Sequence, residues 1–336
     1  MKRLTAVVAF TVTAAAVLLS AAPASATYPG KNGWIAFRKV LSPGFHAPYT
    51  GYNHAALYLI RPDGTGLRQL THPRDGVVNT QPDWSPNGRW IAYQRTKKGH
   101  PTQIFRIRRN GTDGQNLSRL CGPEFDICES NPAWSPGGRR IAFTRVWRPE
   151  EGSEPQVNIF VMRANGTHRV AVTSGPVSLH EDYAPQWSPN GKRLVFERLN
   201  NPKSKAAAFT VRLDGTGLRR LTPWWMDAGA LPDWSPHGRW IMFFNHTESE
   251  VPKTLWLVRP NGEGLHRITT TSGGRFTWWS ASFSPSGRRI AAGRSDWAQD
   301  GAKADVYVLK KTGEILRNVT QSVRWDSEPD WGPRRK

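Results

Sequence analysis

After residue 26, the apolar positions of the chain fall in short runs that are separated by turn-forming sequences such as Asp-Gly, Asn-Gly and Ser-Pro-x-Gly. No part of this region keeps its apolar residues at the spacing of an amphipathic helix. Short apolar runs between dipeptides that tolerate positive φ are typical of antiparallel β-hairpins. The pattern therefore predicts an all-β protein.

One motif recurs six times, and its first copy is QPDWSPNGRWIAY at residues 81–93. The fifth copy has Ser282 in place of the proline and Phe283 in place of the tryptophan. The motif aromatic stands at positions 84, 134, 187, 234, 283 and 331, so successive copies lie 50, 53, 47, 49 and 48 residues apart. A nearly fixed period of this length indicates a repeat architecture.

Each repeat is predicted to contain four antiparallel strands. The motif aromatic belongs to the first strand, and Ser-Pro-x-Gly forms a tight turn to the second. Second strands are expected at 34–37, 90–93, 140–143, 193–196, 240–243 and 289–292. Third strands are expected at 56–60, 104–108, 159–163, 209–213, 255–259 and 306–310. A second tight turn then leads to a fourth strand, as at 67–71 and 265–269.

Four-stranded antiparallel units repeated around a centre form a β-propeller. The N-terminal part supplies strands two to four of one blade, and the C-terminal part supplies a lone first strand that ends at Pro333. We expect these parts to pair, which would close a six-bladed ring and protect the sheet edges. The ring would form a single domain over residues 27–336. The motif aromatics are expected to pack between neighbouring blades.

The repeat resembles that of the TolB-type β-propeller family. The shared features are Pro-x-Trp-Ser-Pro-x-Gly-Arg-x-Ile-Ala-Phe, a third strand such as Ile159–Arg163, and a following Asn-Gly-Thr. The resemblance covers essentially all of residues 29–333 and implies a propeller fold. Full TolB proteins carry an α/β domain before the propeller, and we expect no such domain here because the first predicted strands follow directly after the predicted signal peptide. Peptidases with similar propellers add a hydrolase domain with a Gly-x-Ser-x-Gly nucleophile motif, which this sequence lacks.

The first 26 residues have the pattern of a secretory signal peptide. Lys2 and Arg3 precede an apolar run over 7–19, and Ala24-Ser25-Ala26 forms a small-residue cleavage site. The alternative is a membrane anchor, for which the apolar run is short. We expect cleavage after Ala26, secretion out of the cytoplasm, and no transmembrane segment in the remaining chain.

The chain is strongly basic, with a formal charge of +20 that becomes +18 when Lys2 and Arg3 are removed. Such a surface favours polyanions such as an anionic cell-wall polymer, although it also serves solubility. We expect a basic rim formed by residues that follow the short turns or lie on fourth strands: Arg89, Arg139, Arg140, Lys192, Arg193, Arg239, Arg288, Arg289, Arg68, Arg219, Arg220, Arg267 and Arg317. No nucleic-acid-binding module is recognised, so no nucleic-acid partner is expected.

Cys121 and Cys128 are the only cysteines. In an exported protein they are expected to form a local disulfide, worth roughly 2.5 kcal/mol in the chain-entropy account. Two thiols without neighbouring histidines supply too few ligands for a metal site.

Long loops between second and third strands, and between repeats, are expected on the face opposite the short turns, where binding usually takes place. Exposed aromatic residues there suit sugar rings or protein partners, although they could instead fill gaps between the loops. The candidates are Trp224, Trp225, Trp278, Trp279, Trp325 and Tyr183.

Three acidic residues, Glu129, Asp182 and Asp326, stand three positions before the motif proline and are expected at the mouth of the central channel. Converging carboxylates could hold calcium or another divalent cation. The alternative is that each caps a turn or pairs with a nearby arginine. No sequence feature requires a cofactor, and metal binding is left open.

These features favour a monomeric, non-catalytic binding module for a protein or glycan partner at the cell envelope. One alternative is a metal-assisted lyase or hydrolase with its site at the channel mouth. Another is a purely electrostatic wall binder. No nucleophile stands out and no metal-ligand spacing recurs, so no catalytic residue is assigned.

Overall fold

The computed structural model describes residues 29–42, 54–118, 128–150, 152–245, 253–270, 275–296 and 303–334. These residues form strands throughout, with two short 3-10 helices, η1 (Asn201–Lys203) and η2 (Trp224–Met226). The predicted all-β class is therefore confirmed. The expected signal peptide and Cys121 lie outside the described residues, and only the backbone of Cys128 is described, so the disulfide stays a prediction. The described part of the chain contains no helix long and apolar enough to cross a membrane.

The strands follow the order predicted from the repeat. First strands are β4 (Val77–Trp84), β8 (Cys128–Trp134), β12 (His180–Trp187), β16 (Ala228–Trp234), β20 (Phe276–Phe283) and β24 (Asp326–Pro333). Second strands are β1 (Asn32–Val40), β5 (Trp90–Lys97), β9 (Arg140–Trp147), β13 (Arg193–Asn200), β17 (Ile241–Asn245) and β21 (Arg289–Asp296). Third strands are β2 (Ala55–Ile60), β6 (His100–Arg108), β10 (Gln156–Arg163), β14 (Lys205–Arg212), β18 (Leu255–Val258) and β22 (Lys303–Lys310). Fourth strands are β3 (Arg68–Gln69), β7 (Gln115–Asn116), β11 (Val170–Ala171), β15 (Arg219–Arg220), β19 (His266–Arg267) and β23 (Ile315–Asn318).

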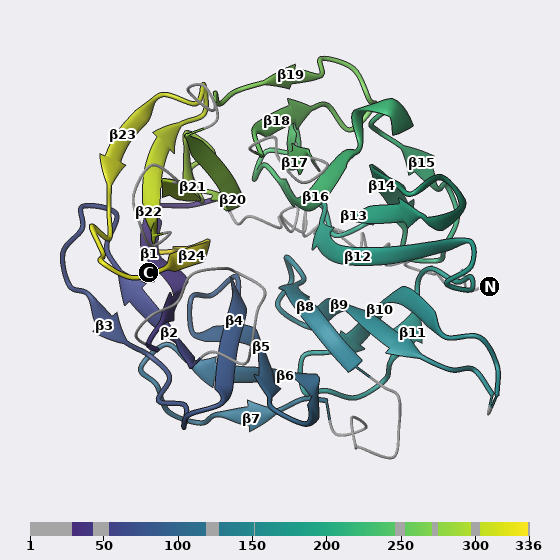
Figure 1. Cartoon of the computed structure of the whole chain (residues 1–336), viewed down its shortest axis with the longest axis horizontal. Helices are drawn as coiled ribbons and strands as arrows, with labels where there is room; N and C mark the ends of the chain where they lie inside the picture. The colour runs from purple at the N-terminus through teal and green to yellow at the C-terminus, as the bar shows by residue number, and fades with distance from the viewer. Residues whose placement is uncertain are drawn as a thin grey trace, which may run out of the picture.

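The sheets follow one another around a common centre, with the first strands innermost (Figure 1). Four sheets have four strands each, and one sheet has eight. The eight-stranded sheet consists of β24-β1-β2-β3 and β4-β5-β6-β7, which are joined by a single parallel pair between Ala55 and Val78. β24 pairs with β1 in antiparallel register, with Trp331 opposite Ile35. The predicted pairing of the two ends of the chain is thus confirmed.

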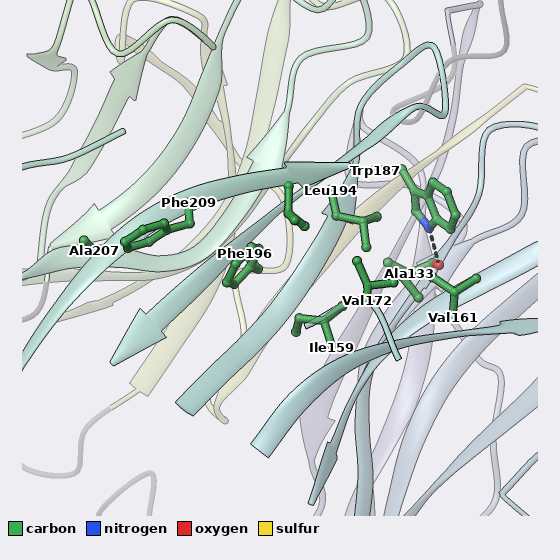
Figure 2. Packing of buried hydrophobic residues seen from close by; sticks show 11 residues of the cluster. Ala133, Ile159, Val161, Val172, Trp187, Leu194, Phe196, Ala207 and Phe209 are labelled. Carbon is green, nitrogen blue, oxygen red and sulfur yellow. Dashed lines mark hydrogen bonds between the residues drawn. The ribbon is translucent and has the colours of Figure 1, made fainter. Parts of the chain in front are cut away.

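The core lies between successive sheets, because each sheet is buried on both faces. In the cluster of Figure 2, Trp187, Leu194 and Phe196 of one sheet pack against Ile159 and Val172 of the preceding sheet. The indole Nε1 of Trp187 also donates a hydrogen bond to the carbonyl of Ala133, at 3.0 Å. All six motif aromatics are between 0% and 4% exposed, which confirms their packing role. Truncating one such aromatic to alanine typically costs about 3–5 kcal/mol.

Every first strand contains a β-bulge just before the motif aromatic, which the sequence did not predict. In five of the six repeats the residue before the proline has positive φ: Gln81, Asn131, Ala184, Leu231 and Glu328. In the fifth repeat, where Ser282 replaces the proline, the preceding Ala281 does not. The bulge turns the following side chains toward the central channel and toward the neighbouring sheet.

Candidate functional site

The central channel is lined by the bulged segments of all six first strands, which surround about 790 Å³ of space including its open ends. Three carboxylates from the position before the motif aromatic lie here, and each accepts a backbone hydrogen bond from the next repeat. Trp134 N–H donates to Asp83 at 2.6 Å, Phe283 N–H to Asp233 at 2.7 Å, and Trp84 N–H to Asp330 at 2.7 Å. In the fifth repeat Ser282 Oγ plays the same part for Trp331 N–H, at 2.9 Å. These acids therefore join adjacent repeats.

Burial changes the ionisation of these channel carboxyls. Burial raises the pKa of Asp330 to about 7, although the N–H donors of Trp84 and Trp331 oppose the change. The pKa of Asp83 is raised by burial and then by the nearby charge of Asp330. Asp83 and Asp330 do not both ionise readily, because burial disfavours each charged form and the charge of one carboxylate disfavours that of the other.

The three acids predicted to converge on a cation are each paired with their own basic residue. Arg198 donates to both oxygens of Asp182, at 2.6 and 2.8 Å. Arg169 Nε lies 2.8 Å from Glu129. Lys39 Nζ lies 3.1 Å from Asp326, a carboxyl whose pKa burial nonetheless raises to about 7.

All three carboxylate side chains are fully buried, so these pairs compensate charges that would otherwise be costly inside the protein. Within the described ranges, no group of three His, Cys, Asp or Glu residues is arranged to hold a metal ion. The expected convergence of Glu129, Asp182 and Asp326 on one cation is therefore wrong. The alternative of local pairing with basic residues describes them correctly.

The predicted aromatic surface is divided between core and solvent. Trp278 and Trp325 are 2% and 3% exposed and belong to separate core clusters, so placing them on a binding surface was wrong. They fill gaps where first strands leave the long loops. Trp279 is half-buried and contacts Trp325, with ring centroids 5.6 Å apart.

The other three aromatic candidates are more accessible. Trp224 and Tyr183 are half-buried, and Trp224 packs against the ring of Phe209 at 5.7 Å. Trp225 is 80% exposed. The structure thus keeps Trp225 as an accessible aromatic on the long-loop face, beside Trp224 in η2.

A cation near the end of the second strand recurs in five of the six repeats and was missed from the sequence: Lys39, Arg95, Arg145, Arg198 and Arg294. Each lies over an aromatic ring of the third strand, at 5.9, 4.3, 5.1, 5.2 and 4.1 Å from the centroid. The signal was available as a basic residue two positions after the second-strand aromatic or its equivalent. Each such side chain covers the third-strand ring near the long-loop end of its sheet.

The short-turn face carries a cation in every repeat at the end of the third strand: Arg61, Arg108, Arg163, Arg212, Arg259 and Lys310. Five further cations follow the Ser-Pro-x-Gly turns and are all exposed: Arg89, Arg139, Lys192, Arg239 and Arg288. In three repeats a half-buried tryptophan lies beneath the arginine at the end of the third strand. Arg61 lies 4.8 Å from the ring of Trp34, Arg108 lies 4.8 Å from that of Trp90, and Arg259 lies 5.6 Å from that of Trp240. We call this surface the basic face.

Some predicted rim arginines also form hydrogen bonds between neighbouring repeats. Arg317 donates to the carbonyl of Asp63 at 2.8 Å, and Arg68 and Arg219 donate in the same way to Arg109 and Asn261. Each bond joins a fourth strand to the turn of the next repeat. Partial burial lowers the pKa of Arg68, but the guanidinium stays charged at neutral pH. These residues therefore hold the rim together and still contribute positive charge.

The architecture is similar to that of solved TolB structures. TolB from Acinetobacter baumannii aligns with a TM-score of 0.66 at 19% identity, covering 90% of this chain and 67% of that chain. A putative TolB from Agrobacterium tumefaciens aligns with a TM-score of 0.61 at 18% identity, covering 88% and 90%. An oligogalacturonate lyase in complex with manganese aligns with a TM-score of 0.53 at 12% identity, covering 78% and 70%. Comparison with family models and with curated protein sequences finds no match.

Proposed function

Because the chain folds as a TolB-like β-propeller, we propose that it is a six-bladed, secreted, non-catalytic binding module that attaches to an anionic polymer of the cell envelope through its basic face. The eight-stranded sheet counts as two blades in this proposal, since its halves share one bridge. The observation that carries the proposal is the cation at the end of every third strand.

Five acidic residues of the described chain lie in the turns beside the basic face and offset part of its charge, but they are fewer than its eleven cations: Asp63, Asp113, Asp214, Glu263 and Glu314. Asp63 and Asp214 are engaged in their own turns, where bonds from Thr65 and Thr216 lower the pKa of each carboxyl. Three cations of this face form exposed pairs with nearby acids, Arg108 with Asp113, Arg259 with Glu263 and Lys310 with Glu314, and such exposed pairs are weak enough to exchange partners. A repeating array of exposed cations suits a polymer with regularly spaced negative charges, because many weak contacts add together.

The first experiment is cosedimentation of the protein with cell envelope isolated from the producing organism, across a salt series. We expect binding to fall steeply as salt rises, because exposed charges are screened over about 10 Å at 0.1 M salt. Polyglutamate should compete for the protein, whereas neutral dextran should not. Binding that resists salt would contradict the proposal.

Two matched double variants locate the binding surface. Arg139→Gln with Lys192→Gln removes two charges from the basic face, whereas Lys98→Gln with Lys203→Gln removes two exposed charges from the long-loop face. The first pair should lower the salt concentration at which half of the protein is released, and the second should leave it nearly unchanged. Equal effects of the two pairs would mean that only net charge matters, and would overturn the assignment to this face.

A second candidate use, a protein or glycan partner on the long-loop face, is supported by Trp225. Its side chain is 80% exposed, and tryptophan is enriched among the residues that contribute most to protein interfaces. The Trp225→Ala variant should keep its thermal stability, because the side chain is already in solvent. It should lose any envelope binding that survives high salt; binding that is unchanged would exclude this use.

A further inference from the structure

A cleft opens between two neighbouring repeats on the long-loop side, away from the basic face. It is formed by the link that follows β3 and by the β5–β6 hairpin, and it encloses about 1090 Å³ including its open mouth. Its lining residues are His72, Pro73, Arg74, Val77, Arg95, Lys97, His100, Pro101, Gln103 and Phe105. Three of these are cations, two are histidines, and none is acidic. We call it the Arg95 cleft.

Arg95 lacks the opposite carboxylate that two of the equivalent cations have. Arg198 is held by Asp182, and Lys39 by Asp326, in each case by the residue directly opposite on the first strand. The residue opposite Arg95 is Asn79, whose Oδ1 accepts a hydrogen bond from Arg95 Nε at 2.9 Å. An amide satisfies the donor but brings no negative charge.

No neighbouring side chain makes up this deficit. Arg95 Nη2 donates to the hydroxyl of Tyr93 at 3.1 Å, which is again a neutral partner. Within the described ranges, neither Arg74, Arg95 nor Lys97 forms an ion pair. Asp75, the nearest acidic residue in the link, is 98% exposed and lies beside His54. The cleft therefore concentrates positive charge against a half-buried guanidinium.

The wall of the cleft also offers an uncovered ring. In three other repeats a tryptophan packs on the ring at the position equivalent to Phe105. Trp147 packs on Phe160 at 5.6 Å, Trp224 on Phe209 at 5.7 Å, and Trp278 on Tyr307 at 6.2 Å. Among described residues, Phe105 has ring contacts only with Tyr93 and Arg95, and it lines the cleft directly. An apolar ligand surface can take the place of the missing tryptophan.

We propose that the Arg95 cleft binds the phosphate or carboxylate group of a small sugar-sized ligand. The anion supplies the charge that Asn79 does not, and Arg95, Arg74 and Lys97 surround it with donors. A guanidinium binds such planar or tetrahedral anions through charge-assisted hydrogen bonds. The carbon skeleton of the ligand packs on Phe105. This site is separate from the basic face, so the proposal can be tested independently of attachment to the envelope.

The test is calorimetric titration of the folded protein with glucose 6-phosphate, glucuronate, inorganic phosphate and neutral glucose. We expect glucose 6-phosphate or glucuronate to bind with one site, inorganic phosphate to bind more weakly, and glucose not to bind. The two sugar acids distinguish a phosphate from a carboxylate preference. Absence of binding by all three anions would overturn the proposal.

The decisive variant is Asn79→Asp, which supplies inside the protein the carboxylate found at this position in three other repeats, as Glu129, Asp182 and Asp326. It should weaken binding of the preferred sugar acid at least tenfold and leave the melting temperature unchanged or raised. Lys97→Gln should weaken binding several-fold without affecting the fold, because Lys97 is exposed. Unchanged affinity of the Asn79→Asp protein would contradict the role of Arg95. Loss of binding in the Arg139→Gln, Lys192→Gln protein would place the anion site on the basic face instead.

Discussion

At the residue scale, the side chain before the motif aromatic joins neighbouring repeats in four of the six repeats. Asp83, Asp233 and Asp330 accept N–H bonds from the next repeat, and Ser282 does so in the fifth repeat. The sequence shows that aspartate recurs at this position, but its bonding partner is about fifty residues away and could not be identified. The same limit applied to Asp182, whose partner Arg198 is identified only when the strands are placed in register. It also applied to Glu129, which lies opposite Arg145 but pairs with Arg169.

Asp233→Ala should destabilise the protein by about 1–3 kcal/mol, because the backbone N–H of Phe283 would remain buried without an acceptor. Urea unfolding followed by tryptophan fluorescence measures the change. Asp233→Asn keeps an acceptor oxygen and should lose less. If both variants were as stable as the native protein, the bond would not join the sheets.

The raised pKa of Asp330 makes stability depend on pH. An aspartate in the unfolded chain ionises near pH 3.9, whereas Asp330 in the folded protein ionises near 7. Between these values the folded state holds a proton that the unfolded state releases, so the contribution of Asp330 to stability is fully present below about pH 4 and is lost as pH rises through 7. Melting temperatures from pH 4.5 to 7.5 should show this fall.

The variant Asp330→Asn should flatten that dependence, because an amide neither gains nor loses the proton. Some fall should remain, since burial also raises the pKa of Asp83 and of Asp326. A pH dependence identical to that of the native protein would mean that Asp330 ionises normally in the folded state.

At the scale of the element, the sequence predicted strand order, turns and the pairing of β24 with β1, because these depend on apolar runs and on local turn chemistry. It did not predict the bulge in each first strand or the cation over the third-strand ring in five of the six repeats. Both arise from contacts between elements. The burial of Trp278 and Trp325 was missed for the same reason. The local sequence around a tryptophan near a loop does not show whether its side chain faces the core or the solvent.

Gly332 gives a test at this scale. Serine follows the motif aromatic in the other five repeats, and glycine stands there in the sixth. A Cβ at Gly332 would lie 2.5 Å from Cδ2 of the buried Trp84 ring. Gly332→Ser therefore restores the repeat sequence yet should destabilise the protein by about 1–3 kcal/mol through overpacking. Chemical denaturation measures the difference.

The control is Gly137→Ala. This glycine lies in another repeat, has no positive φ, and has open space around its Cβ position. It should leave stability within about 0.5 kcal/mol of the native value, as is usual for surface substitutions. A Gly332→Ser protein as stable as this control would show that the seam between Trp84 and β24 is loosely packed.

At the scale of the whole molecule, one strand completes the ring. A chain that ends at Arg324 lacks β24 and leaves the inner edge of β1 unpaired, so it should lose cooperative unfolding. Adding a synthetic peptide of residues 325–336 in excess should raise its melting temperature, because a ligand that binds only the folded state stabilises it. A truncated chain that melts like the full protein would contradict ring closure.

The two broad faces of the molecule differ for a reason that belongs to this scale. Tight turns and third-strand ends place the exposed arginines together on the basic face, whereas the opposite face contains the Arg95 cleft and Trp225. The sequence analysis predicted the cations that follow the tight turns, since they recur at one motif position, but it did not predict the cations at the third-strand ends. The cleft depends on two departures from the repeat, Asn79 and the missing tryptophan over Phe105, which stand out only when repeats are superposed.

The pairing of β24 with β1 also means that the ring can close only after the last strand has been synthesised. The ribosome adds about 5–20 residues per second, so β1 waits roughly fifteen to sixty seconds for the strand that covers its edge. During that interval the nascent chain presents an open hydrogen-bonding edge on which other chains can nucleate aggregation. A holding chaperone that releases the chain only after its last residues emerge would therefore raise the yield of native protein more than one that accelerates folding.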